Sequence, residues 1–262
     1  TRAVYAQKLG RDVTPDDVEP LTWALAEVGR MASAPQWLAT IEYMHGYDLG
    51  RWLRYLRLTS TPMPWEEAVF IILRALDGLH YAHTIRRGDG TPAGVLHRDV
   101  SPGNILLDLE GQVRLLDFGI ARALQGDAAE YKTRDGELSG KISYMAPELF
   151  SEASSSVASD IYACSLVLYL MLAGAHPFAG ESESRTMWRV IHEMPEPLAS
   201  FRDDLPAELP LVVFRSLAKA PQHRHQSAER LAHDLRRLLT RNESDIRHDL
   251  RHRLRRDFTG KM

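Results

Sequence analysis

The run SDIYACSLVLYLMLAG at residues 159–174 constrains the fold most, because it is apolar on nearly every side. A helix with this pattern has no face suited to water, so it must be buried on all sides. The single cysteine of the chain, Cys164, lies inside this run and is expected to be a packed thiol, not a nucleophile. The run therefore predicts a central helix that other elements surround.

Composition describes an ordinary globular protein of one or two domains: 262 residues, 44% hydrophobic and 26% charged. The net charge of −3 gives no argument for nucleic acid or an anionic membrane as a partner. One cysteine excludes an intrachain disulfide, and neither a membrane span nor a signal peptide is recognisable. These features favour a reducing, cytoplasmic setting.

The order of predicted elements gives an α+β protein with two unequal lobes. A short strand, a helix and a β-leaning run are predicted at 2–10, 16–34 and 35–46. A hairpin is predicted where 105–109 and 112–118 flank Glu110-Gly111, and 119–147 has the polar character of a long functional loop. Further helices are predicted at 47–58, 64–84, 184–194, 209–220 and 227–241.

Three side-chain oxygens gather around the predicted hairpin, in the stretch HRDVSPGNILLDLEGQVRLLDFG at 97–119. Asn104 precedes one strand and Asp117 ends the other, so both side chains can face one site. Carboxylate and amide oxygens suit Mg²⁺ bound to a polyphosphate. Asp99 lies five residues before Asn104 and can accept a proton from an incoming hydroxyl. Singly, each residue would be interpreted as a turn cap, but together they indicate phosphoryl transfer.

The motifs HRDVSPGN, DFG and MAPE, in this order and spacing, resemble those of the protein kinase superfamily. The residues of these motifs are most similar to those of bacterial Ser/Thr kinases of the eukaryotic-like type, and the resemblance covers about residues 38–240. It implies a kinase-like two-lobe fold with a small, apparently incomplete β-containing N-lobe and hinge at 1–44. A largely helical C-lobe would follow at 45–240, and a basic C-terminal tail or linker at 241–262.

By this resemblance, Asp99 would be the catalytic base, while Asn104 and Asp117 would hold Mg²⁺ on ATP. Further residues would contact the nucleotide: Ile41 as gatekeeper, Glu42 and Met44 through their backbone, and Ala6 and Leu106 on the two faces of adenine.

The resemblance also assigns supporting roles. Asp160 would hold the backbone of the catalytic loop, and Glu148 would pair with Arg224. His97 and Phe118 would pack in the regulatory hydrophobic stack. Arg98 implies control by a phosphate on the activation segment, for which Thr133, Ser139 and Tyr131 are equal candidates as acceptors.

Two departures from the family pattern concern the catalytic loop and the activation segment, which pack against each other in the proteins that the chain resembles. Ser101 stands where most Ser/Thr kinases place a lysine, and Lys141 stands where the activation segment usually has a threonine. Loss of a cation beside the migrating phosphoryl group would cost several kcal/mol of transition-state stabilisation. We therefore expect either an exchange, with Lys141 supplying the missing cation, or a solvated loop lysine at 141.

A third departure concerns the front of the chain, where no Gly-x-Gly-x-x-Gly loop precedes residue 40. Lys8 is the candidate phosphate-binding lysine, with an ordinary edge-strand lysine as the alternative. Glu27 would be its helix partner, and Glu19 is a weaker choice. Either segments are missing from the sequence, or the small lobe is truly reduced.

Two main function classes follow. The first is an ATP- and Mg²⁺-dependent Ser/Thr kinase that acts on protein substrates and self-associates for activation-segment phosphorylation. The second is a pseudokinase that serves as a nucleotide-binding or scaffold module. A small-molecule kinase is a weaker third, because the MAPE segment and the Glu148/Arg224 pair are intact. The histidines His223 and His225, like the basic tail, are expected to be solvated.

Overall fold

A computed structural model of the chain describes residues 46–118, 142–151 and 154–259. The chain divides into two compact units, Thr1–Gly46 and Tyr47–Met262. Apart from Gly46, every element described below belongs to the second unit. The strand, helix and β-leaning run predicted for the first 45 residues lie outside the described residues.

The predicted central helix is α6, Val157–Ala173, and it is buried along almost its whole length. Ser156 caps its first turn, with a reciprocal hydrogen bond to Ser159, and Gly174 ends it in the left-handed conformation at φ 71°. Cys164 is fully buried, and burial raises the pKa of its thiol. The prediction of a buried helix with a packed thiol is confirmed.

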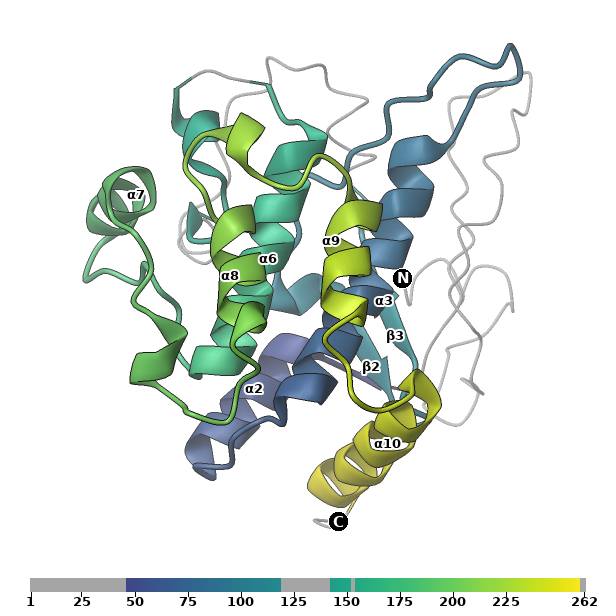
Figure 1. Ribbon diagram of the computed structural model, residues 1–262, viewed down its shortest axis with the longest axis vertical. Coiled ribbons are helices and arrows are strands. Elements are labelled where there is room, and N and C mark those ends of the chain that lie inside the picture. The colour runs from purple at the N-terminus through teal and green to yellow at the C-terminus, as the bar shows by residue number, and fades with distance from the viewer. Residues whose placement is uncertain (1–45, 119–141, 152–153, 260–262) are drawn as a thin grey trace, which may run out of the picture. The chain divides into compact units, whose positions relative to one another are not determined.

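Other helices surround α6, as Figure 1 shows. α3, Trp65–Thr84, packs along α6 and also contacts α9, Ala228–Arg236. α8, Glu208–Ser216, covers another side of α6. Two shorter helices are α2, Leu49–Leu58, and α7, Glu183–His192. Short 3-10 helices occur at Pro102–Asn104, Pro147–Phe150, Leu198–Ser200 and Pro221–His223.

A small sheet has the order β1-β2-β3, formed by Gly46–Asp48, Ile105–Asp108 and Val113–Leu115. β2 and β3 are antiparallel and form the predicted hairpin, with Ile105 opposite Leu115. Gly111 takes the left-handed conformation at φ 73° in the turn. β3 packs on α3, so the hairpin is fixed against the helical core.

The helices at 209–220 and 227–241 are shorter than predicted, ending at Ser216 and Arg236. The first leaves helical geometry at its C-cap residue, Leu217, and a 3-10 helix begins at Pro221. No helix among the described residues is both long and apolar enough to cross a lipid bilayer.

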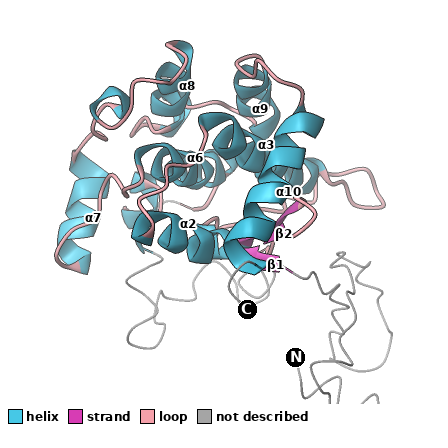
Figure 2. Ribbon diagram, turned by 90° about the horizontal axis from the view of Figure 1, so that it is seen from below, coloured by secondary structure: helices cyan, strands magenta, loops and turns pink. Residues whose placement is uncertain are grey.

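α10, Glu243–Thr259, differs most from expectation, because the stretch 241–262 was expected to be a solvated tail or linker. Ile246, Leu250 and Leu254 are fully buried, and the helix packs against α3. Figure 2 shows α10 beside β2 and close to α2. These three residues and Phe258 recur every four positions, an apolar stripe hidden among arginines. For Glu243–Thr259 the solvated interpretation is wrong.

Replacing Leu250 by Ala tests this packing. The loss of buried methyl groups plus the cavity that remains should lower the free energy of unfolding by about 2–5 kcal/mol. For a domain of this size the melting temperature should fall by roughly 2–4 °C per kcal/mol. Leu211 is 69% exposed, so Leu211→Ala is the control and should change stability by less than about 0.5 kcal/mol. Equal melting curves for the two variants would mean that α10 is not docked.

Candidate active site

The loop at 97–104 is held by one buried carboxylate, that of Asp160 in α6. The backbone N–H groups of His97 and Arg98 donate to its two oxygens at 2.9 and 2.8 Å. The Asp160 side chain is 2% exposed, so these bonds are shielded from water. The structure thus places Asp160 where its expected role of holding the loop requires it.

His83, in the last turn of α3, is a third partner of Asp160 that the sequence analysis missed. Its Nε2 lies 2.9 Å from an Asp160 carboxylate oxygen, and its side chain is only 6% exposed. The contact ties α3 to α6 beneath the loop. The available signal was a histidine at the end of a predicted amphipathic helix, which alone does not point to a buried partner.

Two non-glycine residues of the site have left-handed backbone conformations, Arg98 at φ 66° and Asp117 at φ 56°. This conformation is unfavourable for residues with a Cβ and persists only where the surroundings impose it. For Arg98 the Asp160 bond supplies such a constraint. The strain lies at the two ends of the oxygen-rich stretch.

Asn104 is fixed by both its backbone and its side chain. Its N–H donates to the Ser101 carbonyl at 3.0 Å, and its Nδ2 donates to the Asp99 carbonyl at 2.7 Å. The amide nitrogen is thereby used within the loop. The amide oxygen is then the atom of this side chain that is chemically suited to a cation.

The hairpin brings Asn104 and Asp117 to the same end. Because Ile105 lies opposite Leu115, Asn104 lies opposite Leu116, whose N–H donates to the Asn104 carbonyl at 2.8 Å. Asp117 is the next residue and is exposed. One amide oxygen and one accessible carboxylate at adjacent strand ends fit the donor set that Mg²⁺ prefers.

His97 connects the loop to the residues after β3. Its Nδ1 accepts from the Asp99 N–H at 3.2 Å, so Nε2 carries the proton and donates to the Leu116 carbonyl at 2.7 Å. Burial lowers the pKa of His97, which keeps the ring neutral and preserves this tautomer. Its ring lies 4.7 Å from that of Phe118, and the predicted contact between the two is confirmed.

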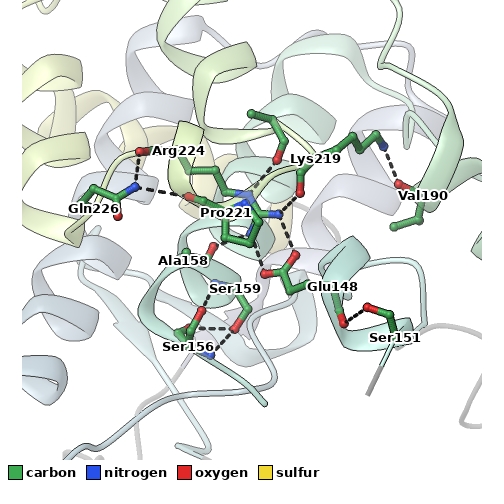
Figure 3. A network of polar contacts seen from close by, with 11 residues as sticks. Glu148, Ser151, Ser156, Ala158, Ser159, Val190, Lys219, Pro221, Arg224 and Gln226 are labelled. Carbon is green, nitrogen blue, oxygen red and sulfur yellow. Dashed lines mark hydrogen bonds and ion pairs between the residues drawn. The ribbon is translucent and has the colours of Figure 1, made fainter. Parts of the chain in front are cut away.

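Glu148 and Arg224 form the predicted ion pair, drawn in Figure 3. The guanidinium donates to both carboxylate oxygens, at 2.8 and 2.7 Å. Its remaining N–H groups donate to the carbonyls of Ala218, Lys219 and Ala158, so all five donors of Arg224 are used. The pair fixes the segment containing MAPE to the loop between α8 and α9.

His225, the residue after Arg224, is 1% exposed, so the expectation that it is solvated is wrong. Its Nδ1 lies 2.5 Å from the Ser216 hydroxyl, and its Nε2 lies 3.1 Å from an Asp234 oxygen. Both partners come from the helices that flank the loop. The loop therefore directs the His225 ring inward, and no pattern in a single sequence predicts this. His223 is exposed as expected.

The other predicted site residues divide between described and undescribed parts of the chain. Leu106 is half-buried in β2 and faces away from the side occupied by Ile105 and Leu107. Ser101 has extended backbone before the 3-10 helix and caps no N–H with its side chain. The following lie outside the described residues: Ala6, Lys8, Glu19, Glu27, Ile41, Glu42, Met44, Tyr131, Thr133, Ser139 and Lys141.

His176 contacts the residue just before the MAPE segment, with its ring edge-on to Tyr144 at a centroid distance of 5.1 Å. Its Nδ1 accepts from the Phe178 N–H at 3.1 Å. Burial lowers the pKa of His176 from its ordinary value of 6.5 to about 4, because the charged ring loses its water. Folding therefore favours the neutral ring.

This pKa predicts a loss of stability in acid. Above pH 6.5 the His176 ring is neutral in the folded and unfolded states. Between pH 6.5 and about 4 the His176 ring takes up a proton in the unfolded chain but not in the folded one. The free energy of unfolding therefore decreases as the pH is lowered through this range. The full contribution is about 3 kcal/mol. Urea unfolding of His176→Asn from pH 4 to 8 should show a flatter profile than wild type, whereas the exposed-residue control His223→Asn should not.

Comparison with known proteins gives one family. The family model described as "Protein kinase domain" matches residues 28–238. The tyrosine-protein kinase MasK of Myxococcus xanthus is 33% identical over 78% of the chain. The serine/threonine-protein kinase PknB of Mycobacterium tuberculosis is 33% identical over 76%, and a probable serine/threonine-protein kinase of Corynebacterium efficiens is 34% identical over 77%. The matched regions span only 31%, 30% and 29% of these relatives, in the same order.

Proposed function

The chain belongs to the protein kinase family, and we propose that it transfers the γ-phosphoryl group of ATP to a serine or threonine hydroxyl of a protein. The observation that carries the proposal is the convergence of Asp99, Asn104 and Asp117 on one loop and one hairpin end. The similarity to relatives that are named Ser/Thr kinases supports serine or threonine as the acceptor, whereas MasK is named a tyrosine kinase.

Each residue has a distinct part in this proposal. Bound Mg²⁺ and ATP would supply the phosphoryl group and neutralise its charge. The Asn104 amide oxygen and the Asp117 carboxylate would hold the metal. Asp99 would orient the substrate hydroxyl and accept its proton, while Asp160 keeps the loop that carries Asp99 in place.

For the nucleotide contacts, the proposal rests on the family resemblance. They are Lys8 toward the phosphates with Glu27 as its partner, and Ala6, Ile41, Glu42, Met44 and Leu106 around adenine. We also propose a reducing, cytoplasmic setting and transient self-association through which one copy phosphorylates the activation segment of another.

Transfer from radiolabelled ATP tests the proposal directly. The full chain with MgCl₂ should label dephosphorylated casein or itself, and phosphoamino acid analysis should find label on serine or threonine. Label confined to tyrosine would contradict the Ser/Thr assignment. Nucleotide binding without label would favour the pseudokinase, for which the motivating observation is the lack of a Gly-x-Gly-x-x-Gly loop before residue 40.

The exchange between Ser101 and Lys141 is part of the same proposal. Lys141→Ala should lower the transfer rate by roughly 10²–10³-fold if that lysine stabilises the migrating phosphoryl group. Adding Ser101→Lys to this variant should restore much of the loss, because it returns a cation to the usual place. Unchanged turnover in Lys141→Ala would make Lys141 a solvated loop residue.

A further inference from the structure

α10 begins at Glu243, beyond the family match, which ends at residue 238. This helix nevertheless contacts two elements that reach the candidate active site. They are α2, which its last turn contacts, and the β2–β3 turn, which a row of arginines contacts; a buried ion pair also fixes the helix to α3.

The last turn of α10 holds α2. Trp52 of α2 is fully buried, and its indole N–H donates to an Asp257 oxygen at 3.0 Å. The other Asp257 oxygen accepts from Arg256 at 2.9 Å, and the Asp257 side chain is 2% exposed. Phe258 stacks on Tyr47, with ring centroids 3.8 Å apart. Because a buried carboxylate needs its donors, the position of α2 against α10 is closely specified.

The first turn of α2 in turn touches the catalytic loop. A Cβ added to Gly50 would lie 3.6 Å from Pro102 Cβ and 3.8 Å from the Gly103 nitrogen, both ordinary contact distances. Pro102 and Gly103 lie between Ser101 and Asn104 in the loop. Any shift of α2 therefore changes the packing of the residues that position Asn104.

One side of α10, which carries Arg247, Arg251 and Arg255, holds the turn of the hairpin. Arg255 donates to the Leu109 carbonyl at 3.0 Å and pairs with Glu110. The approach is close, since a Cβ at Gly111 would lie 2.7 Å from the Arg247 carbonyl oxygen. The opposite end of the same hairpin carries Asn104 and Asp117.

An ion pair fixes α10 to α3 as well. Arg253 lies 3.0 Å from Glu67, whose side chain is 4% exposed. Burial raises the pKa of Glu67, and Arg253 opposes this shift by favouring the charged carboxylate. A buried carboxylate on α3 that meets an arginine of α10 argues for a built contact and not for chance packing of a tail.

We propose that α10 is a positioning element of the active site: through Trp52–Asp257 and Arg255–Glu110 it holds α2 and the β2–β3 hairpin so that the catalytic loop keeps its productive geometry. The inference rests on the proposed kinase function for its catalytic consequence. Its structural consequence, a more mobile loop when α10 is loosened, holds without it.

The test variant is Asp257→Leu in the full chain, which keeps the side-chain size but removes the acceptor for Trp52. Casein phosphorylation should lose roughly ten- to a hundredfold in kcat, with the KM for ATP changed less than about twofold, because misplacement acts on the chemical step. Asp257→Asn retains an acceptor oxygen and should recover most of the kcat.

Leu231→Ala is the stability control, since Leu231 is fully buried in α9, which packs on α3. When kcat is measured well below the melting temperature, Leu231→Ala should keep the wild-type value, even if it lowers the free energy of unfolding as much as Asp257→Leu does. A kcat loss in Leu231→Ala equal to that in Asp257→Leu would overturn the proposal, because general destabilisation would then explain both.

Hydrogen exchange without nucleotide separates this proposal from the kinase assignment. Asp257→Leu should speed amide exchange at 97–104 and in the hairpin, whereas Leu231→Ala should not. Equal exchange at 97–104 in both variants would refute the positioning role. Wild type that transfers no phosphate would refute the proposed function alone, and the exchange result would still decide the role of α10.

Discussion

Asp99→Asn is expected to reduce phosphoryl transfer by roughly 10²–10⁴-fold while leaving the fold and nucleotide affinity in place. The asparagine has the same size but cannot accept the proton of the substrate hydroxyl. Two contacts of residue 99 that order the loop use backbone atoms: its N–H donates to His97, and its carbonyl accepts from Asn104. The substitution leaves both in place, so the loss should fall on the chemical step.

The measurement is the initial rate of radiolabel transfer to casein, beside a titration with a fluorescent ATP analogue. Asp203 is an exposed aspartate in another part of the chain, so Asp203→Asn is the matched control and should keep wild-type activity. Wild-type rates in Asp99→Asn would remove Asp99 from the mechanism. Loss of analogue binding together with activity would instead indicate a damaged nucleotide site.

Local patterns were sufficient to predict much of the helical part. The apolar run at 159–174 predicted α6, and the helical pattern at 64–84 predicted α3, because hydrophobic periodicity and helix-start signals act within a few residues. The hairpin followed from two short apolar runs around Glu110-Gly111. The placement of Asn104 beside Asp117 then follows from strand register alone.

Contacts between distant parts of the chain were not predicted. His83 and Asp160 are 77 residues apart, and Trp52 and Asp257 are 205 apart. In a single sequence nothing links such pairs, because burial of a polar side chain depends on which partner the fold brings to it. The many arginines of α10 also hid its apolar stripe, because a basic segment is usually exposed to solvent. In the structure Arg253 and Arg255 instead contact α3 and the hairpin turn.

Arg224→Ala should have the largest effect on stability among the polar substitutions. It would leave the Glu148 carboxylate, whose side chain is 13% exposed, without its cation. It would also remove the donor for the carbonyl of Ala218 and for those of Lys219 and Ala158, which Figure 3 labels. Breaking a buried pair from one side costs about 3–5 kcal/mol. For a domain of this size that corresponds to a fall of roughly 6–20 °C in melting temperature.

Two further variants separate charge from geometry. Arg224→Lys keeps the positive charge but cannot bind both carboxylate oxygens and three carbonyls at once, so its melting temperature should lie between wild type and Arg224→Ala. Arg241 pairs with Asp249 on the surface, where the two side chains are 41% and 48% exposed. Arg241→Ala should therefore cost less than about 1 kcal/mol. Equal melting temperatures for Arg224→Ala and Arg241→Ala would show that the Glu148–Arg224 contact does not hold the MAPE segment. Other contacts would then have to anchor the activation segment.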